Sequence, residues 1–230
     1  LMLRVVADLK REATDARVWS LAWHPTRRLL AATDEARAVV LWGPDAADDA
    51  ASWRPLLLLD HAHARTVRSC AWHPAGELLA TASFDGLVMV WKLERASPEA
   101  AHDDFDCIAS LEGHENEVKC VRWSTSGSYV ATCGRDKTVF VWEADDELYE
   151  VASVMHSHTQ DVKHVAWHPA RDDVLASASY DDTVKLYVSD GDDWRVDATL
   201  AGHSSTVWCL AFSSDGAGLV TCSDDRSVIL

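Results

Sequence analysis

Residues 114–142 read "HENEVKCVRWSTSGSYVATCGRDKTVFVW", and this stretch decides the fold. Hydrophobic and polar residues alternate in three runs within it, namely "VKCVRW", "SYVATC" and "TVFVW". Alternation with a period of two indicates β-strands with one buried face, and the Ser, Gly and Asp residues between the runs indicate tight turns. The stretch therefore predicts three consecutive antiparallel strands.

Two further segments repeat the same order of landmarks. They are residues 63–91, "HARTVRSCAWHPAGELLATASFDGLVMVW", and residues 158–187, "HTQDVKHVAWHPARDDVLASASYDDTVKLY". A blade of a β-propeller repeats every roughly 40 to 45 residues, and weaker, more polar runs such as "DCIASL" and "RVDATL" suit its outer, solvent-facing strand. We therefore predict an all-β chain of five repeats. The aromatic residues that end the first strand of each repeat are 49, 51, 44 and 45 residues apart, at Trp23, Trp72, Trp123, Trp167 and Phe212.

Composition restricts the classes of partner. The chain has 230 residues, of which 48% are hydrophobic, and this is ample for a folded core. Its net charge of -16 opposes nucleic acid and anionic membranes as partners. No run approaches the roughly 18 apolar residues of a membrane helix, and the N-terminal residues lack the apolar core of a signal peptide. We therefore expect a cytoplasmic protein, with the nucleus as an additional compartment, that binds neither nucleic acid nor membrane.

The six cysteines do not have the spacing of a metal site. They stand at positions 70, 107, 120, 133, 209 and 222, and no CxxC pair occurs among them. Cys70, Cys120 and Cys209 fall inside strand-like runs, and Cys133 and Cys222 each follow a threonine in another such run. A free cysteine in such a place behaves as a small buried apolar residue. We therefore expect no bound metal and no cofactor.

The repeats resemble those of the WD-repeat β-propeller family. "EGH" at residues 112–114 and "AGH" at residues 201–203 match the family's Gly-His, and Trp91 and Trp142 stand where its closing dipeptide begins. The resemblance covers nearly the whole chain and implies one β-propeller domain over residues 1–230, with five of seven four-stranded blades forming a partial ring. Both ends of the chain are then expected to fall inside a larger ring. The implied segments are 1–10 for the outer strand of the closing blade, 14–60 for blade one, 61–111 for blade two, 112–155 for blade three, 156–200 for blade four and 201–230 for a partial blade five.

The resemblance also implies a structural tetrad of His, Ser or Thr, Asp and Trp in each blade. A carboxylate in a tight turn beside a core must be hydrogen-bonded, and the other three side chains meet that need. Because the same His, hydroxyl and Asp recur in several blades whereas an enzyme needs one site, we interpret them as structural and assign no catalytic residue. The tetrads are His63, Thr81, Asp85 and Trp91; His114, Thr132, Asp136 and Trp142; His158, Ser177, Asp181 and Tyr187; and His203, Thr221 and Asp225; blade one has Thr14, Ala32, Ala36 and Trp42 at these positions and lacks the network.

Three positions per blade are expected to lie on one end face of the propeller. They are the residue before the tetrad Asp and the residues three and five after the tetrad His. On an otherwise acidic body they would form a cationic and aromatic patch suited to a short acidic or carboxylate-ended peptide with an aromatic side chain. The alternative is an ordinary surface that happens to include some Lys and Arg. The candidate partner-binding residues are Arg135, Lys119, Lys163, Arg68 and Arg17, with Phe84, Tyr180, Trp19 and Trp208.

Longer segments, including "SLAWHPTRRLLAA", "LATASFDG" and "EADDELYE", are similar to WD-repeat proteins of cytosolic iron–sulfur protein assembly. This similarity implies a non-catalytic adaptor that works with other subunits of a targeting complex. It would bring apo iron–sulfur clients to the assembly machinery, recognising some of them by a C-terminal tail that ends in an aromatic residue. The family has an arginine where Arg135 stands.

The sequence departs from its relatives at one tripeptide, and two alternative functions remain open. Related animal proteins carry a Leu-Tyr-Arg tripeptide, proposed as a dock for a co-chaperone, where this chain has Leu186, Tyr187 and Val188. Docking by that route is therefore not expected, and we interpret Tyr187 as a substitute for the tetrad tryptophan. Because a fold does not fix a function, a ubiquitin-ligase substrate receptor or a chromatin or signalling scaffold is the alternative, and an enzyme is the third class.

Overall fold

The computed structural model describes residues 9–10, 15–44, 52–61, 63–94, 104–191 and 193–230. This part of the chain contains strands, turns and loops but no helix, and therefore none that could cross a membrane. The strands form five antiparallel sheets, four of them with four strands and the last with three. The prediction of an all-β propeller is confirmed.

Each sheet is one blade whose strands follow each other in chain order. Blade one comprises β1 (Val18–Trp23), β2 (Leu30–Asp34), β3 (Val39–Pro44) and β4 (Trp53–Leu59). Blade two comprises β5 (Val67–Trp72), β6 (Leu78–Ser83), β7 (Val88–Glu94) and β8 (Asp104–Leu111). Blade three comprises β9 (Val118–Trp123), β10 (Tyr129–Gly134), β11 (Val139–Asp145) and β12 (Leu148–Met155). Blade four comprises β13 (Val162–His168), β14 (Arg171–Ser179), β15 (Val184–Ser189) and β16 (Trp194–Leu200), and blade five comprises β17 (Val207–Phe212), β18 (Leu219–Ser223) and β19 (Val228–Ile229).

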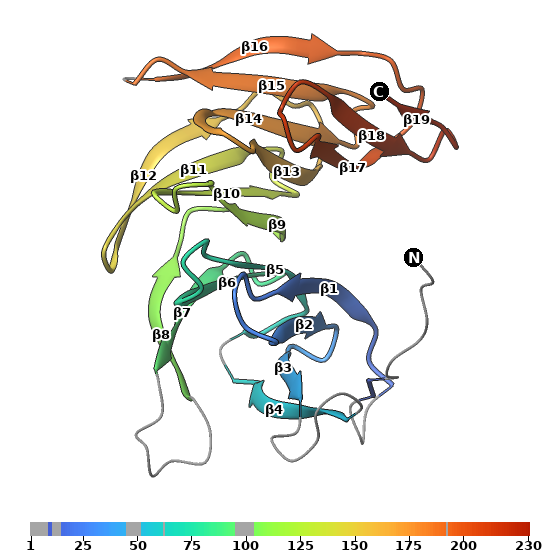
Figure 1. The fold of residues 1–230 in the computed structure, drawn as a ribbon. Helices are drawn as coiled ribbons and strands as arrows, with labels where there is room; N and C mark the ends of the chain where they lie inside the picture. Colours follow the sequence, from blue (N-terminus) through green and yellow to red (C-terminus); the bar gives the residue numbers. More distant parts are fainter. Residues whose placement is uncertain (1–8, 11–14, 45–51, 62, 95–103, 192) are drawn as a thin grey trace.

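The blades stand side by side around an arc, as Figure 1 shows. Their first strands, β1, β5, β9, β13 and β17, contact one another in sequence along the inner side, and the fourth strands lie at the outer edge. The closing-blade strand expected over residues 1–10 falls mainly on residues 1–8, which lie outside the described residues, and residues 9 and 10 are not in a strand.

The core lies between the blades, because the sheets of blades two, three and four each bury both faces against their neighbours. Val90 and Ala80 of blade two pack with Val121 and Trp142 of blade three in one such cluster. The equivalent clusters between the other neighbouring blades also contain mostly Val, Leu, Ala and Trp. Burial on both faces explains why the second strands of these three blades contain short continuous apolar runs.

Histidines at the end of the inner strand, or directly after it, join consecutive blades. His24 donates a hydrogen bond from Nε2 to the carbonyl oxygen of Gly76 in the next blade at 2.9 Å, while its Nδ1 accepts from the backbone amide of Arg27 at 3.0 Å. His73 and His168 lie in the same way against Gly127 and Gly216 of their next blades. We call these contacts the histidine latches. Blade three has Ser124 at this position, and there the amide of Thr125 donates to Asp172 of blade four at 3.1 Å instead.

The expectation for the cysteines is correct for Cys70, Cys120 and Cys133, which are buried, but wrong for Cys209 and Cys222, which are exposed. These two face each other as register partners on β17 and β18. Strands of blade five bury one face against blade four, and no described residue packs on the opposite face. The position of a blade in the arc therefore decides the exposure of its cysteines.

Candidate functional site

In blades two and three the tetrad side chains form one hydrogen-bonded chain. His114 donates from Nδ1 to Asp136 at 2.7 Å, and its Nε2 lies 2.8 Å from the hydroxyl of Thr132. The indole N–H of Trp142 donates to the same hydroxyl oxygen at 3.0 Å. In blade two the matching distances for His63, Thr81, Asp85 and Trp91 are 3.0, 2.9 and 2.9 Å.

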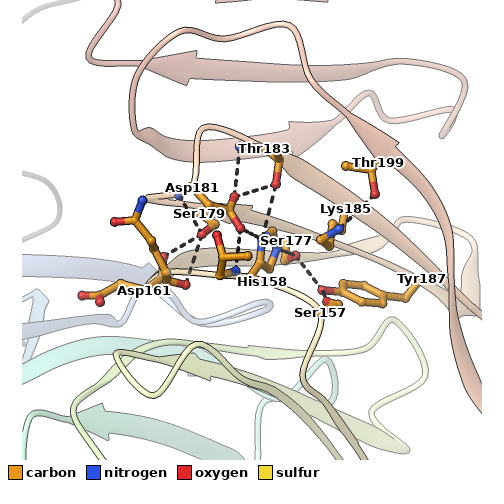
Figure 2. A network of polar contacts seen from close by, with 12 residues as sticks. Ser157, His158, Asp161, Ser177, Ser179, Asp181, Thr183, Lys185, Tyr187 and Thr199 are labelled. Carbon is orange, nitrogen blue, oxygen red and sulfur yellow. Dashed lines mark hydrogen bonds and ion pairs between the residues drawn. The ribbon is translucent and has the colours of Figure 1, made fainter.

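Blade four closes its network with tyrosine in place of tryptophan (Figure 2). His158 lies 2.8 Å from Asp181 and 2.6 Å from Ser177. The hydroxyl of Tyr187 reaches Ser177 at 3.1 Å and Ser157 at 2.7 Å, and the Tyr187 side chain is fully buried. In blade five His203 makes the equivalent contacts with Asp225 and Thr221, both at 2.8 Å.

The tetrad carboxylates are held ionised. Burial by itself raises the pKa of Asp85, but hydrogen bonds from His63 and from the backbone amides of Leu87 and Ala64 outweigh it and bring the pKa to about 2. The pKa of Asp181 is also lowered to about 2, because bonds from Thr183, the Thr159 amide and His158 outweigh the effect of burial. The carboxylates therefore act as fixed acceptors that hold the turns.

Among the described residues, blade one has no such network. Ala32 and Trp42 are buried, Ala36 is exposed, and Thr14 lies outside the described residues. Its turn is held by Asp34, which accepts a hydrogen bond from the amide of Ala38 at 3.0 Å.

The tight turn between the second and third strands of each blade places one residue beside the loop before the inner strand. The amide of Arg135 donates to the carbonyl oxygen of Glu117 at 2.9 Å, and that of Tyr180 to Asp161 at 2.8 Å. Phe84 bonds in the same way to Thr66, Glu35 to Arg17 and Asp224 to Thr206, each at 3.0 Å. The second residue of each inner strand, such as Lys119 or Arg68, lies next to this pair. The same end of every blade therefore presents the same three positions.

On this end the cations lie over aromatic rings. The Lys119 ammonium lies 4.0 Å from the centre of the Phe84 ring, and the Arg68 guanidinium 4.9 Å from that of Trp19. The Lys163 ammonium lies 4.3 Å from the Tyr180 ring and 5.4 Å from the Trp208 ring. Such contacts stabilise a cation where few waters can reach it. We call the surface of Trp19, Arg68, Phe84, Lys119, Arg135, Lys163, Tyr180 and Trp208 the cation–aromatic face.

A buried carboxylate organises the centre of this face. Glu117 is 9% exposed and lies 2.5 Å from Lys119, 2.8 Å from Arg65 and 3.7 Å from Arg135. Burial raises the pKa of Glu117, but hydrogen bonds from Lys119 and Arg65 outweigh it and lower the pKa overall. The Lys119 side chain is only 13% exposed, whereas that of Arg135 is 56% exposed and can receive a ligand.

The remaining cations differ in how they are held. Lys163 lies 3.2 Å from Asp161 and, like Lys119, is mostly buried. Arg17 lies 3.8 Å from Glu35 with a largely exposed side chain, at the blade-one end of the face. Arg68 makes its ring contact with Trp19 and has no ion pair with a described carboxylate.

Sequence reasoning missed Arg65, which the structure places between Phe84 and Glu117. Its guanidinium donates to the Phe84 carbonyl oxygen at 2.6 Å and lies 5.9 Å from the Phe84 ring. Arg65 stands two residues after the tetrad His63, next to a position expected on the face. A count of every residue in the loop before the inner strand would have found it. In the described residues, no group of three or more His, Cys, Asp and Glu side chains could hold a metal ion.

Comparison with known proteins gives the same repeats. The family model described as "WD domain, G-beta repeat" matches residues 6–43, 53–92, 105–143, 149–187 and 194–230. A probable cytosolic Fe-S cluster assembly factor of Schizosaccharomyces pombe is 42% identical over 214 residues, covering 93% of this chain and 33% of that protein. Its counterpart in Schizosaccharomyces japonicus is 44% identical over 226 residues, covering 98% of this chain and 35% of that protein.

A probable cytosolic iron-sulfur protein assembly protein 1 of Neurospora crassa is 44% identical over 133 residues, covering 44% of this chain and 28% of that protein. The chain thus spans about a third of the length of the two Schizosaccharomyces relatives.

Proposed function

This chain belongs to the WD domain, G-beta repeat family, and on that premise we propose that it is a non-catalytic adaptor of cytosolic iron–sulfur protein assembly. In this role it binds apo iron–sulfur clients and the other subunits of a targeting complex. The names of the three relatives, each 42% to 44% identical over the matched part, support the pathway and a cytosolic location.

The cation–aromatic face is the observation that carries the proposal. A net charge of -16 would repel an acidic segment from most of the surface, but Arg68, Lys119, Arg135 and Lys163 gather on one end of blades two to four. A positive patch on a negative body steers an acidic partner to one place and orientation. The proposed ligand is therefore a short acidic peptide, such as a client's C-terminal tail that ends in an aromatic residue.

Each part of such a tail has a counterpart on the face. Glu117 holds Arg135 from one side, and the exposed donors of this guanidinium form a fork that matches a carboxylate. Tyr180 and Trp208, whose rings meet edge to face 6.2 Å apart and which are 43% and 41% exposed, offer apolar contact to an aromatic side chain. Rigid aromatic and arginine side chains are the usual energetic centres of protein interfaces.

The same geometry argues against a catalytic role. Histidine, hydroxyl and carboxylate occur together in four blades, each time sharing the same hydrogen bonds within the blade. They fix turns, and the residues of the cation–aromatic face include no nucleophile paired to a base.

Fluorescence anisotropy tests the proposal. The probe is a labelled peptide with an acidic penultimate residue, a C-terminal tryptophan and a free carboxylate, titrated with the protein. We expect micromolar binding that amidation of the C-terminus abolishes and that Arg135→Ala weakens about tenfold, equivalent to about 1.4 kcal/mol. Arg195→Ala is the matched control, because Arg195 is an exposed arginine on the outer strand β16. Absence of binding by the folded protein, or equal loss in both variants, rejects the face as the client site.

A further inference from the structure

A second site lies at the opposite end of blades two and three. Arg68 and Lys119 stand near the start of the inner strands β5 and β9, whereas Trp72 and Trp123 end these strands. Around Trp123 the two blades enclose a pocket of about 620 Å³. Leu78 and Ile108 of blade two and Ala144, Leu148 and Tyr149 of blade three form its apolar lining.

Two polar atoms of residues that line this pocket have no partner among the described residues. They are the buried indole nitrogen of Trp123 and the buried hydroxyl of Tyr149. The equivalent indoles are paired, since Trp72 donates to the carbonyl oxygen of Ala22 and Trp167 to that of Arg122, each at 3.1 Å. Buried polar groups are nearly always hydrogen-bonded, so two unpartnered polar atoms on residues that line one pocket favour a bound group there.

The rings of this wall form a continuous aromatic surface. Trp123 and Tyr149 meet edge to face at 6.2 Å, and the ring of His73 lies 4.8 Å from that of Trp123. Phe105 occupies the place of Tyr149 in blade two, against Trp72. Since a phenylalanine makes the same ring contact in blade two, the aromatic packing of the blade does not require the hydroxyl of Tyr149.

The rim of the pocket is acidic. Glu77, Asp146 and Glu147 line it together with a single cation, Lys92. Lys92 lies 2.6 Å from Glu147 and so joins blade two to blade three across the rim, with both side chains partly exposed. The rim therefore carries one ammonium and three carboxylates, and this excess of negative charge attracts a further positively charged group.

We propose that this pocket, formed by blades two and three, binds a partner-protein segment that carries an arginine between apolar residues. The arginine stem and guanidinium lie along the Trp123 and Tyr149 rings, and the charge meets the carboxylates of Glu147 and Glu77. A carbonyl oxygen of the segment accepts the Trp123 indole N–H. The site is separate from the cation–aromatic face, so one chain can hold a basic and an acidic partner segment at the same time.

Indole signals in ¹H–¹⁵N NMR spectra provide the test. The probe is the peptide Ac-Leu-Arg-Leu-NH₂, and Trp123→Phe identifies the Trp123 signal. We expect a saturable shift of the Trp123 signal while the signals of Trp72 and Trp167, whose indoles are already hydrogen-bonded, stay in place. The peptide Ac-Leu-Cit-Leu-NH₂, in which neutral citrulline replaces arginine at nearly the same shape, is expected to bind at least tenfold more weakly.

Variants identify the carboxylates. The double substitution Glu77→Gln and Glu147→Gln is expected to weaken the arginine peptide at least fivefold, whereas Glu143→Gln, on an exposed position of β11 outside the pocket, and Arg135→Ala are not. Unchanged spectra with the arginine peptide, or equal affinity for the citrulline peptide, overturn the proposal. A Trp123 signal that moves with protein concentration alone also overturns it, because the occupant is then a second copy of this chain.

Discussion

At the scale of residues, each tetrad converts one buried carboxylate into the fixed point of a turn. Asp136 accepts hydrogen bonds from the His114 ring, the Glu115 amide and the amide and hydroxyl of Thr138. These four hydrogen bonds to one carboxylate fix the backbone conformation of the turn that carries Arg135. The position of the exposed guanidinium on the cation–aromatic face therefore depends on a buried neighbour.

We expect Asp136→Ala to lower the free energy of unfolding by about 1 to 3 kcal/mol, because His114 and the amide of Glu115 lose their buried acceptor. Urea unfolding monitored by circular dichroism measures the change. Glu143→Ala, which removes an exposed carboxylate from the same blade, is the control and is expected to change stability little. An unfolding midpoint equal to that of the wild type would contradict the structural role of Asp136.

Two tyrosines allow the stability contribution of a hydrogen-bonded hydroxyl, that of Tyr187, to be compared with that of an unpartnered hydroxyl, that of Tyr149. Tyr187→Phe removes hydrogen bonds to Ser177 and Ser157 and is expected to cost about 1 to 2 kcal/mol. Tyr149→Phe removes a buried hydroxyl without a described partner and is expected to cost less than about 0.5 kcal/mol. The same unfolding experiment compares the two, and equal losses would show that the Tyr149 hydroxyl is paired in the free protein.

The residue-scale pattern was predictable where it depends on spacing within one repeat. The distances between tetrad residues along the chain are fixed by the strand and turn lengths of a blade, so Tyr187 could be placed although it is not a tryptophan. Contacts between blades follow no such spacing. Glu117 of blade three meets Arg65 of blade two through side-chain directions that only the packed structure shows.

At the scale of elements, each histidine latch requires a glycine in the facing turn of the next blade, because glycine has no Cβ. Gly127 has a φ of 86°, and a Cβ there would collide with the His73 ring. The left-handed backbone and the close approach both exclude other residues. The turn of one blade and the strand end of the previous blade are therefore matched to each other.

We expect Gly127→Ala to destabilise the protein by about 2 to 4 kcal/mol, from backbone strain and from the clash with His73. In the His73→Ala background the clash is absent, and Gly127→Ala is expected to cost only about 1 to 2 kcal/mol. Gly191→Ala is the control for strain alone, because Gly191 has a φ of 103° and a Cβ added there would meet no atom within 4 Å. Additive losses from Gly127→Ala and His73→Ala would contradict the latch.

The strands themselves were predictable from period-two alternation, but the latches were not. In the sequence, "WHP" reads only as a strand end followed by a turn. Its histidine acts on a glycine about 50 residues later in the chain, as for His24 and Gly76. A sequence comparison between blades would show that blade three has Ser124 where blades one, two and four have this histidine. The neighbouring amide of Thr125 instead donates to Asp172 of blade four.

At the scale of the whole molecule, exposure depends on the place of a blade in the arc. Leu21 and Trp23 of β1 are 62% and 61% exposed, whereas their equivalents Cys70 and Trp72 in blade two are buried. The alternation that predicts these strands is the same in both blades, so the sequence of one blade cannot reveal the difference. The same reasoning explains the wrong expectation for Cys209 and Cys222.

The histidines make the stability of the whole molecule depend on pH. Burial lowers the pKa of His24, His73 and His158 from the ordinary value of 6.5. Below pH 6.5 the unfolded chain therefore binds more protons at these histidines than the folded chain does. The stability that they contribute is lost as pH falls from 6.5 through their folded pKa values. Asp85 and Asp181, with a pKa of about 2 against an ordinary 3.8, add a second loss of stability between these two values.

We expect the free energy of unfolding to fall between pH 7.5 and pH 5.5, measured by urea unfolding in about 0.5 M salt, which screens the repulsion within a chain of net charge -16. His24→Gln keeps a donor for the Gly76 carbonyl oxygen but cannot be protonated, so its stability should fall less steeply over this range. Arg195→Ala, remote from the latches, should keep the wild-type slope. If the wild type and His24→Gln have equal slopes, the buried histidines are not the groups that take up protons on unfolding. The pH dependence of the free energy of unfolding would then come from other titratable groups, and the histidine latches would hold the blades together without contributing to it.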